Sequence, residues 1–212
     1  MKYLTLPKAL RISAVLLLCT AVVHADPILA WKLEQKPAPQ QLAASVVDVA
    51  LETGHGLNTL ERTGVKEQTG LNRVYSSTGW NTTDTLDKDT KYIGFKMTVK
   101  PGQTIVLASL DYRISGGKPA PGKGRWGYST DGGKTWTLQE PFLIPENSSR
   151  TGFDMGSWRF QNFTVHAGQT VIFRFWAYGK ENIGGNGAPR PGSNVRLWGG
   201  YGNDLILQGK VQ

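Results

Sequence analysis

Apolar and polar residues alternate along much of this chain, which is the period of a β-strand that buries one face. Residues 92–99 place every second side chain, from Ile93 to Val99, on one face. The run at 106–114 repeats the alternation after a Pro-Gly turn at 101–102. These segments predict a first pair of strands joined by a turn.

A second antiparallel pair is predicted further along the chain. Residues 157–165 and 170–178 flank a His-Ala-Gly-Gln turn, and Phe173 and Phe175 share one face of the second segment. Shorter strands are predicted at 28–33, 45–51, 195–198 and 205–211 and in a hairpin around Asp131. About nine or ten short strands, separated by turns that contain Gly and Pro, are typical of an all-β, antiparallel β-sandwich of the jelly-roll type.

Long segments with helical periodicity are absent from the sequence. Residues 38–44 predict a single helical turn at most, and residues 57–73 predict an irregular polar loop. Two loops, 115–124 and 179–194, are rich in Gly and Pro and carry Lys or Arg. Such loops either carry function or are tolerated surface insertions, and their composition does not decide between the two.

The first 25 residues have the parts of a secretory signal. Basic residues come before an apolar run at 12–23, and Ala25 is the small residue before the cut. We therefore expect residues 1–25 to be removed and residues 26–212 to form one domain. The protein is expected to be secreted, which makes it periplasmic, attached to the cell surface or extracellular. No other segment predicts a membrane span, so no membrane insertion is expected after signal removal.

Removal of the signal changes the charge and the cysteine content. It takes away three bases and no acid, which lowers the formal net charge from +8 to +5, and it removes Cys19, the one cysteine. The remaining chain can form neither disulfides nor Cys-ligated metal sites. Because the remaining bases are dispersed, no nucleic-acid partner is expected.

The sharpest local motif is Ser-Thr-Asp-Gly-Gly-Lys-Thr-Trp at 129–136. It resembles the Asp-box, S-x-D-x-G-x-T-W, of sialidases and several secreted β proteins. In such a hairpin Asp131 accepts hydrogen bonds from backbone N–H groups of its own turn, and Gly132 and Gly133 adopt positive φ. These roles are structural, and a sialidase repeats the box on a much longer chain. The motif therefore implies a stabilised hairpin rather than an activity.

Five segments carry a wider resemblance: 76–81 (SSTGWN), 91–117, 127–137, 170–179 (TVIFRFWAYG) and 195–211 (VRLWGGYGNDLILQGKV). They look like the secreted jelly-roll sandwiches of bacterial surface proteins, which resemble galactose-binding-like and carbohydrate-binding modules. The resemblance implies a β-sandwich that binds carbohydrate.

Side chains suited to catalysis are few in residues 26–212. His55 and His166 are the two histidines, no Gly-x-Ser-x-Gly elbow is present, and the carboxylates lie on separate predicted elements. The sequence therefore predicts no catalytic residue. A jelly-roll polysaccharide lyase is the enzymatic alternative, since it needs a Tyr or His base beside an Arg or Gln. Its Gln-x-His and Tyr-x-Lys-x-Gly-x-Tyr signatures are missing.

One position suits a metal ion. Asp204 follows Asn203 at the start of the last predicted strand, and their oxygen atoms suit a structural Ca²⁺ between the first and last strands of a sandwich. A solvated Asn-Asp turn is the favoured interpretation of the same pair. No cofactor and no metal ligand are therefore predicted.

The predicted binding residues follow from strand phase. If Phe173, Phe175, Val195 and Leu197 point inward, their neighbours point outward. The expected carbohydrate-binding surface then consists of Arg174, Trp176, Tyr178, Arg196 and Trp198. Trp stacks on the C–H face of a pyranose, and Arg donates paired hydrogen bonds to hydroxyl, carboxylate or sulfate groups. In the opposite phase, the Trp side chains belong to the core and the Arg side chains cap them.

Taken together, these patterns predict a secreted β-sandwich that binds a polysaccharide or glycan without catalysis. Two alternatives stay open: a small glycan-cleaving enzyme, and a structural adhesion or matrix component with a protein partner.

Overall fold

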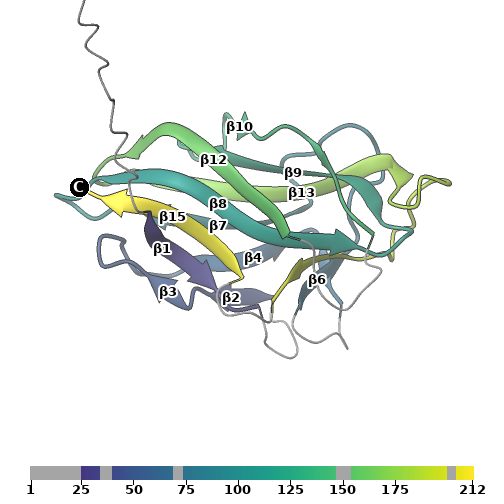
Figure 1. Cartoon of the computed structure of the whole chain (residues 1–212), viewed down its shortest axis with the longest axis horizontal. Coiled ribbons are helices and arrows are strands. Elements are labelled where there is room, and N and C mark those ends of the chain that lie inside the picture. The colour runs from purple at the N-terminus through teal and green to yellow at the C-terminus, as the bar shows by residue number, and fades with distance from the viewer. Residues whose placement is uncertain (1–24, 34–39, 69–73, 147–153, 200–203) are drawn as a thin grey trace, which may run out of the picture.

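The computed structural model describes residues 25–33, 40–68, 74–146, 154–199 and 204–212. These residues contain fifteen β-strands and no helix, and the strands form two antiparallel sheets that face each other (Figure 1). The prediction of an all-β antiparallel sandwich is confirmed. The expected nine or ten strands are too few, because several strands are only two or three residues long and leave no visible alternation.

The first sheet has eight strands and is organised around β8 (Ile105–Gly116). β12 (Asp154–Val165) and β15 (Leu205–Val211) both pair with β8, and β14 (Val195–Trp198) pairs with its last residues. The other strands of this sheet are β1 (Asp26–Trp31), β3 (Val46–Val47), β5 (Lys66–Glu67) and β6 (Val74–Thr78). β1 pairs with β15, and β6 pairs with β14.

The second sheet has seven strands, with β13 (Thr170–Asn182) near its centre. β13 pairs with β9 (Pro121–Ser129) on one side and with β7 (Tyr92–Thr98) on the other. The remaining strands are β2 (Gln41–Ala43), β4 (Thr59–Thr63), β10 (Thr137–Leu138) and β11 (Phe142–Leu143). The end of β13 pairs with the start of β9. The connection that follows β13 therefore lies beside the connection that precedes β9.

Both predicted strand pairs cross between the sheets instead of forming hairpins. β7 lies in the second sheet and β8 in the first, while β12 lies in the first and β13 in the second. The two crossing turns contact each other: Val99 N donates to Gln169 O (3.1 Å), and Gly168 N donates to Val99 O (2.8 Å). The expected pairing of residues 157–165 with 170–178 is therefore wrong, since a tight turn can serve a crossing arch as well as a hairpin.

The core lies between the sheets and is rich in aromatic rings. Phe95, Phe173 and Phe175 are at most 2% exposed. The Phe95 ring stacks on Phe173 with centroids 4.9 Å apart, and the Trp31 ring lies 4.5 Å from that of Phe95. Burial of such a side chain stabilises the fold by roughly 1.5–3 kcal/mol, so the alternating faces of β7 and β13 hold the two sheets together.

Two expectations between residues 38 and 73 are wrong. Residues 41–43, expected in a helical turn, form β2, and part of the expected irregular loop forms β4 and β5. β2 and β4 pair with each other, so long-range pairing decides the conformation of segments whose own pattern is weak. Residues 38–39 and 69–73 lie outside the described residues.

The turn after β9 has the hydrogen bonds expected from its sequence. The Asp131 carboxylate accepts from Thr135 Oγ1 (2.6 Å), Thr135 N (2.9 Å) and Ser129 Oγ (2.7 Å). Gly132 and Gly133 have φ angles of 76° and 95°. The hydrogen bonds, led by that from the Thr135 side chain, hold the pKa of Asp131 well below its usual range. The ionised Asp131 carboxylate therefore stabilises this turn through its hydrogen bonds.

Residues 1–24, which hold nearly all of the predicted signal and Cys19, lie outside the described residues. In the part of the chain that the structure describes, no helix is long and apolar enough to cross a membrane.

Candidate functional site

The predicted binding surface on β13 has the expected phase but is covered. Phe173 and Phe175 belong to the core, which places Arg174 and Trp176 on the outer face of the second sheet. Trp176 is nevertheless only 1% exposed, and Tyr178 is 5% exposed. The expectation that these aromatic rings face solvent is therefore wrong.

Segments distant in the sequence cover this face. The Trp136 ring, from the turn after β9, packs edge-on against Trp176 with centroids 5.1 Å apart. The Lys88 carbonyl accepts hydrogen bonds from Trp176 Nε1 (3.3 Å) and from Arg174 Nη1 (2.7 Å). The Arg174 guanidinium also lies 3.9 Å from the Tyr92 ring centroid and 4.7 Å from that of Trp136. The chain's own groups thus occupy the stacking and hydrogen-bonding positions that a sugar would need.

The second predicted pair, Arg196 and Trp198, lies in the other sheet. Val195 and Leu197 are buried in the core, so the pair is on the outer face of the first sheet. Trp198 is 6% exposed and donates from Nε1 to Ser115 Oγ. Arg196 is half-buried, and burial lowers the pKa of its guanidinium. The two Arg-x-Trp pairs therefore form no common surface, because strand phase does not reveal which sheet a strand joins.

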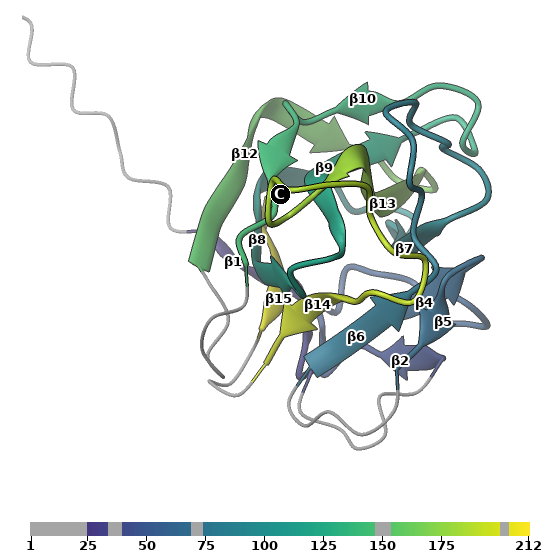
Figure 2. The ribbon, with the colours of Figure 1, turned by 90° about the vertical axis from the view of Figure 1, so that its right-hand side faces the viewer.

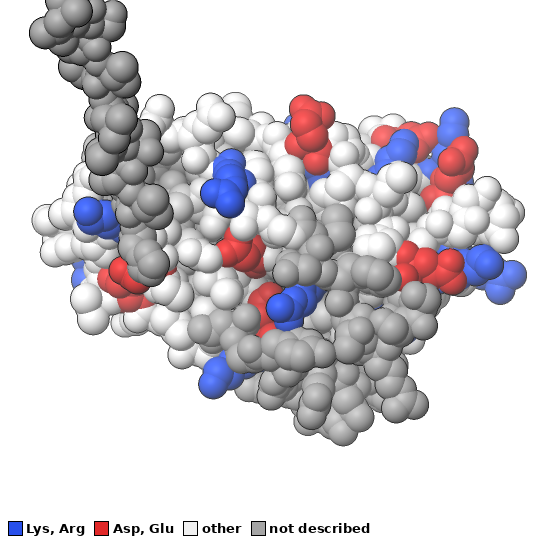
Figure 3. All heavy atoms as spheres, in the orientation of Figure 1, with Lys and Arg blue, Asp and Glu red and all other residues white. Residues whose placement is uncertain are grey.

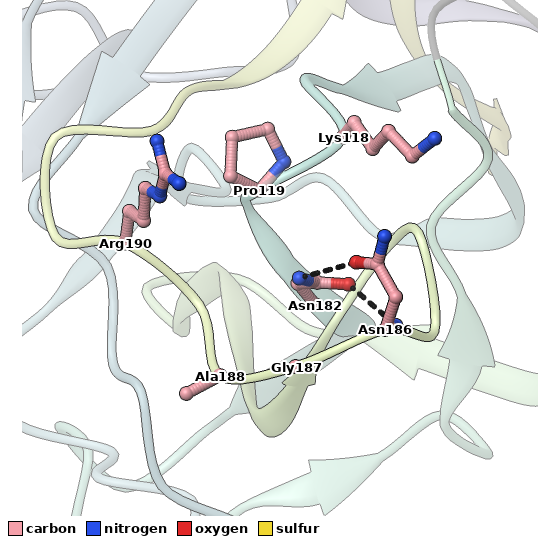
Figure 4. A pocket seen from close by; sticks show the side chains of 7 residues that line it. All are labelled: Lys118, Pro119, Asn182, Asn186, Gly187, Ala188 and Arg190. Atoms are coloured by element: carbon pink, nitrogen blue, oxygen red, sulfur yellow. Dashed lines mark hydrogen bonds between the residues drawn. The ribbon is translucent and has the colours of Figure 1, made fainter.

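A different cavity lies at the end of the sandwich toward which β8 and β13 run. Figure 2 faces this end, and the connection from β13 to β14 passes across it. The cavity has a volume of about 460 Å³, within the range of about 300–1,000 Å³ that is usual for small-molecule sites. Its lining residues come from the two Gly- and Pro-rich loops of the sequence: Lys118, Pro119, Asn182, Asn186, Gly187, Ala188 and Arg190 (Figure 4). We call this cavity the Lys118–Arg190 basin.

Backbone hydrogen bonds hold the two loops of the basin together. The turn between β8 and β9 is closed by Ala120 N, which donates to Gly117 O at 2.8 Å. The carbonyls of Lys118 and Pro119 accept from Gly184 N (3.1 Å) and Arg190 N (2.9 Å) of the longer loop. The geometry of the basin is therefore set before any ligand arrives, which lowers the entropic cost of binding.

An asparagine pair forms one wall of the basin. Asn182 Nδ2 donates to Asn186 Oδ1 (3.0 Å), and Asn186 N donates to Asn182 Oδ1 (3.2 Å). Figure 4 shows this pair on one side of Pro119, whose ring lies between the side chains of Lys118 and Arg190. The Nδ2 group of Asn186 has no acceptor among the described residues, so it can donate to a ligand.

Two basic side chains, Lys118 and Arg190, line the basin. Nearby, Asp84 binds Lys123 (3.0 Å) and Lys180 (3.4 Å), and the hydrogen bond from Lys123 is the main cause of a lowered Asp84 pKa. Lys118 and Arg190, in contrast, take part in no ion pair within the described ranges. Over the face shown in Figure 3, acidic and basic groups are interspersed. No carboxylate of the described residues therefore neutralises the two cations that line the basin.

The groups that could support catalysis or hold a metal lie elsewhere. His55 and His166 are exposed and do not line the basin. Asp204 is 5% exposed, and its Oδ2 accepts from Leu33 N (2.9 Å), so it links the start of β15 to the chain after β1. Asn203 lies outside the described residues. Among the residues that the structure describes, no three His, Cys, Asp or Glu side chains are grouped so as to hold a metal ion.

Comparison with known proteins gives no family for this chain. It matches no protein-family model, and a search of curated proteins finds no match.

Proposed function

We propose that this chain is a secreted, non-catalytic carbohydrate-binding protein whose glycan site is the Lys118–Arg190 basin. The observation that carries the proposal is a preformed cavity with polar donors on either side of an apolar Pro119 face. Carbohydrate sites combine hydrogen-bond donors for oxygen atoms with an apolar surface for C–H groups. The resemblance of the sequence to carbohydrate-binding modules supports the same assignment.

The lining of the basin favours binding over cleavage. A polysaccharide lyase needs a Tyr or His base within hydrogen-bond reach of the substrate, and the lining residues include neither. Paired carboxylates, which glycoside hydrolysis needs, are also missing from the lining. The side chains present can bind and orient a sugar, but they supply neither the Tyr or His base of a lyase nor the carboxylate pair of a glycoside hydrolase.

A glycan array probed with the purified protein tests this proposal. We expect binding to at least one glycan, with no release of unsaturated or reducing ends. Ala188→Trp should fill the basin and reduce binding more than about tenfold, since a bulky ring displaces the ligand. Ala167→Trp is the matched control, because Ala167 is exposed in the turn after β12, at the opposite end of the sandwich.

Two results would contradict the proposal. Failure to bind any glycan would exclude the function, provided that the protein is folded. Binding that Ala188→Trp leaves unchanged would place the glycan site elsewhere on the molecule.

A further inference from the structure

The polar side-chain groups of the basin that have no partner among the described residues are all of one kind. Lys118 Nζ, the Arg190 guanidinium and Asn186 Nδ2 are hydrogen-bond donors, and none of them is bonded to another described side chain. The amide oxygens of Asn182 and Asn186 already accept hydrogen bonds within the chain. A ligand therefore meets donors in excess, two of them positively charged.

This arrangement discriminates between classes of glycan. A sugar hydroxyl both donates and accepts, so a wall of donors uses only part of its bonding capacity. A carboxylate or sulfate group presents acceptors only, and its negative charge can pair with Lys118 and Arg190. Charge-assisted hydrogen bonds are roughly twice as strong as neutral ones, so the anionic group gains more from the basin.

We infer that the Lys118–Arg190 basin selects acidic glycans, by holding a carboxylate or sulfate group between Lys118, Arg190 and Asn186. This inference rests on the proposed function and adds the ligand class to it. None of the residues that line the basin carries a carboxylate.

The test compares matched oligosaccharides that share one backbone and differ in charge. Titration calorimetry with a neutral, a uronate-containing and a sulfated form should give at least about tenfold tighter binding for an acidic form, the equivalent of one charge-assisted contact. The preference should decrease with added salt, because exposed charges are screened. The ranking of uronate against sulfate identifies which anionic group the basin holds.

Matched variants locate the effect. Lys118→Gln and Arg190→Gln should each weaken acidic binding about fivefold to tenfold. They should weaken neutral binding by a smaller factor, because Gln keeps a hydrogen-bond donor but not the charge. Lys32→Gln and Arg159→Gln are the controls, because both side chains are exposed and neither lines the basin. Asn186→Asp keeps the shape of the amide but adds a negative charge, so it should also weaken acidic binding. Asn162→Asp, on the exposed part of β12, is its control.

The outcomes separate this inference from the proposed function. Equal binding of neutral and acidic forms, abolished by Ala188→Trp, would overturn the charge selectivity while leaving the glycan site in place. Binding of inorganic sulfate or DNA at the basin, with no glycan bound, would overturn the assignment to glycans. Retention of the acidic preference in the folded double variant Lys118→Gln/Arg190→Gln would show that these cations do not select the ligand.

Discussion

At the scale of single residues, Trp176 is a structural contact between three parts of the chain. It lies on β13, packs against Trp136 from the turn after β9, and donates to the carbonyl of Lys88. A large side chain at 1% exposure makes contacts on nearly all of its surface. Its loss would leave a cavity under Trp136 rather than an open binding face.

Trp176→Ala should therefore destabilise the protein by about 3–5 kcal/mol, the usual cost of removing a large buried aromatic side chain. Urea unfolding measures the change in the free energy of unfolding. Trp136→Ala, at a partly exposed position, should cost less and serves as the comparison. An unchanged unfolding midpoint for Trp176→Ala together with lost glycan binding would return this face to consideration as the binding surface.

The alternation of β13 predicted the correct face for each side chain but not its exposure. Phase is a local property, set by the period of the strand. Exposure depends on which segments cover that face, and Lys88 and Trp136 are distant from Trp176 in the sequence. The residues of the basin could be named only as members of two unusual loops, because the pairing of β13 with β9 that joins these loops leaves no local pattern.

At the scale of elements, the two crossing turns form one hydrogen-bonded unit. Val99, which follows β7, forms backbone hydrogen bonds with Gln169 and Gly168 in the turn between β12 and β13. Lys100 N also donates to Ala50 O (2.9 Å), which ties a third connection to the same place. Turn amides commonly exchange through local opening, but the Val99 bonds continue the pairing of β7 with β13 beyond Thr98 and Thr170.

The amides of Val99 and Gly168 should therefore exchange with deuterium as slowly as those of central strands, through global unfolding. Gly185 provides a contrast, since its amide bonds to Asn182 O within one exposed loop (3.0 Å) and should exchange faster. Native-state hydrogen exchange followed by NMR measures all three. Exchange of Val99 at the rate of Gly185 would show that the crossing turns open independently.

The same turns explain why strand positions were predicted better than strand partners. Residues 92–99 and 170–178 alternate clearly and form β7 and β13. A Pro-Gly or His-Ala-Gly-Gln turn fixes a reversal of direction but not whether the chain returns to its own sheet. That choice is made by the packing of both faces, which involves residues far apart in the sequence.

At the scale of the whole molecule, a buried tyrosine makes the stability of the fold depend on pH in the alkaline range. Tyr112 on β8 is 3% exposed, shares hydrogen bonds with the side chain of Gln139 and packs on the Trp126 ring of the other sheet. Burial raises the pKa of its hydroxyl to about 12. An unfolded chain loses this proton near pH 10, so the folded state binds more protons between the two values.

The contribution of Tyr112 to the free energy of unfolding should therefore be constant below about pH 10 and decrease as pH rises toward 12. Urea unfolding across this interval, with tyrosine ionisation followed by absorbance, measures the loss. Tyr112→Phe should reduce the slope of stability against pH, although burial raises the pKa of Tyr75 as well and leaves part of the slope. An identical slope in the variant would show that Tyr112 ionises without unfolding.

The crossing turns and the basin lie at opposite ends of the strands. β8 and β13 begin at the crossing turns and end at the two loops that line the basin. Insertions and exchanges in those loops consequently leave the joint between the sheets untouched. Changes confined to the exposed residues of these loops can thus alter ligand preference, and the end with the basin is the natural position at which to graft a new specificity onto this sandwich.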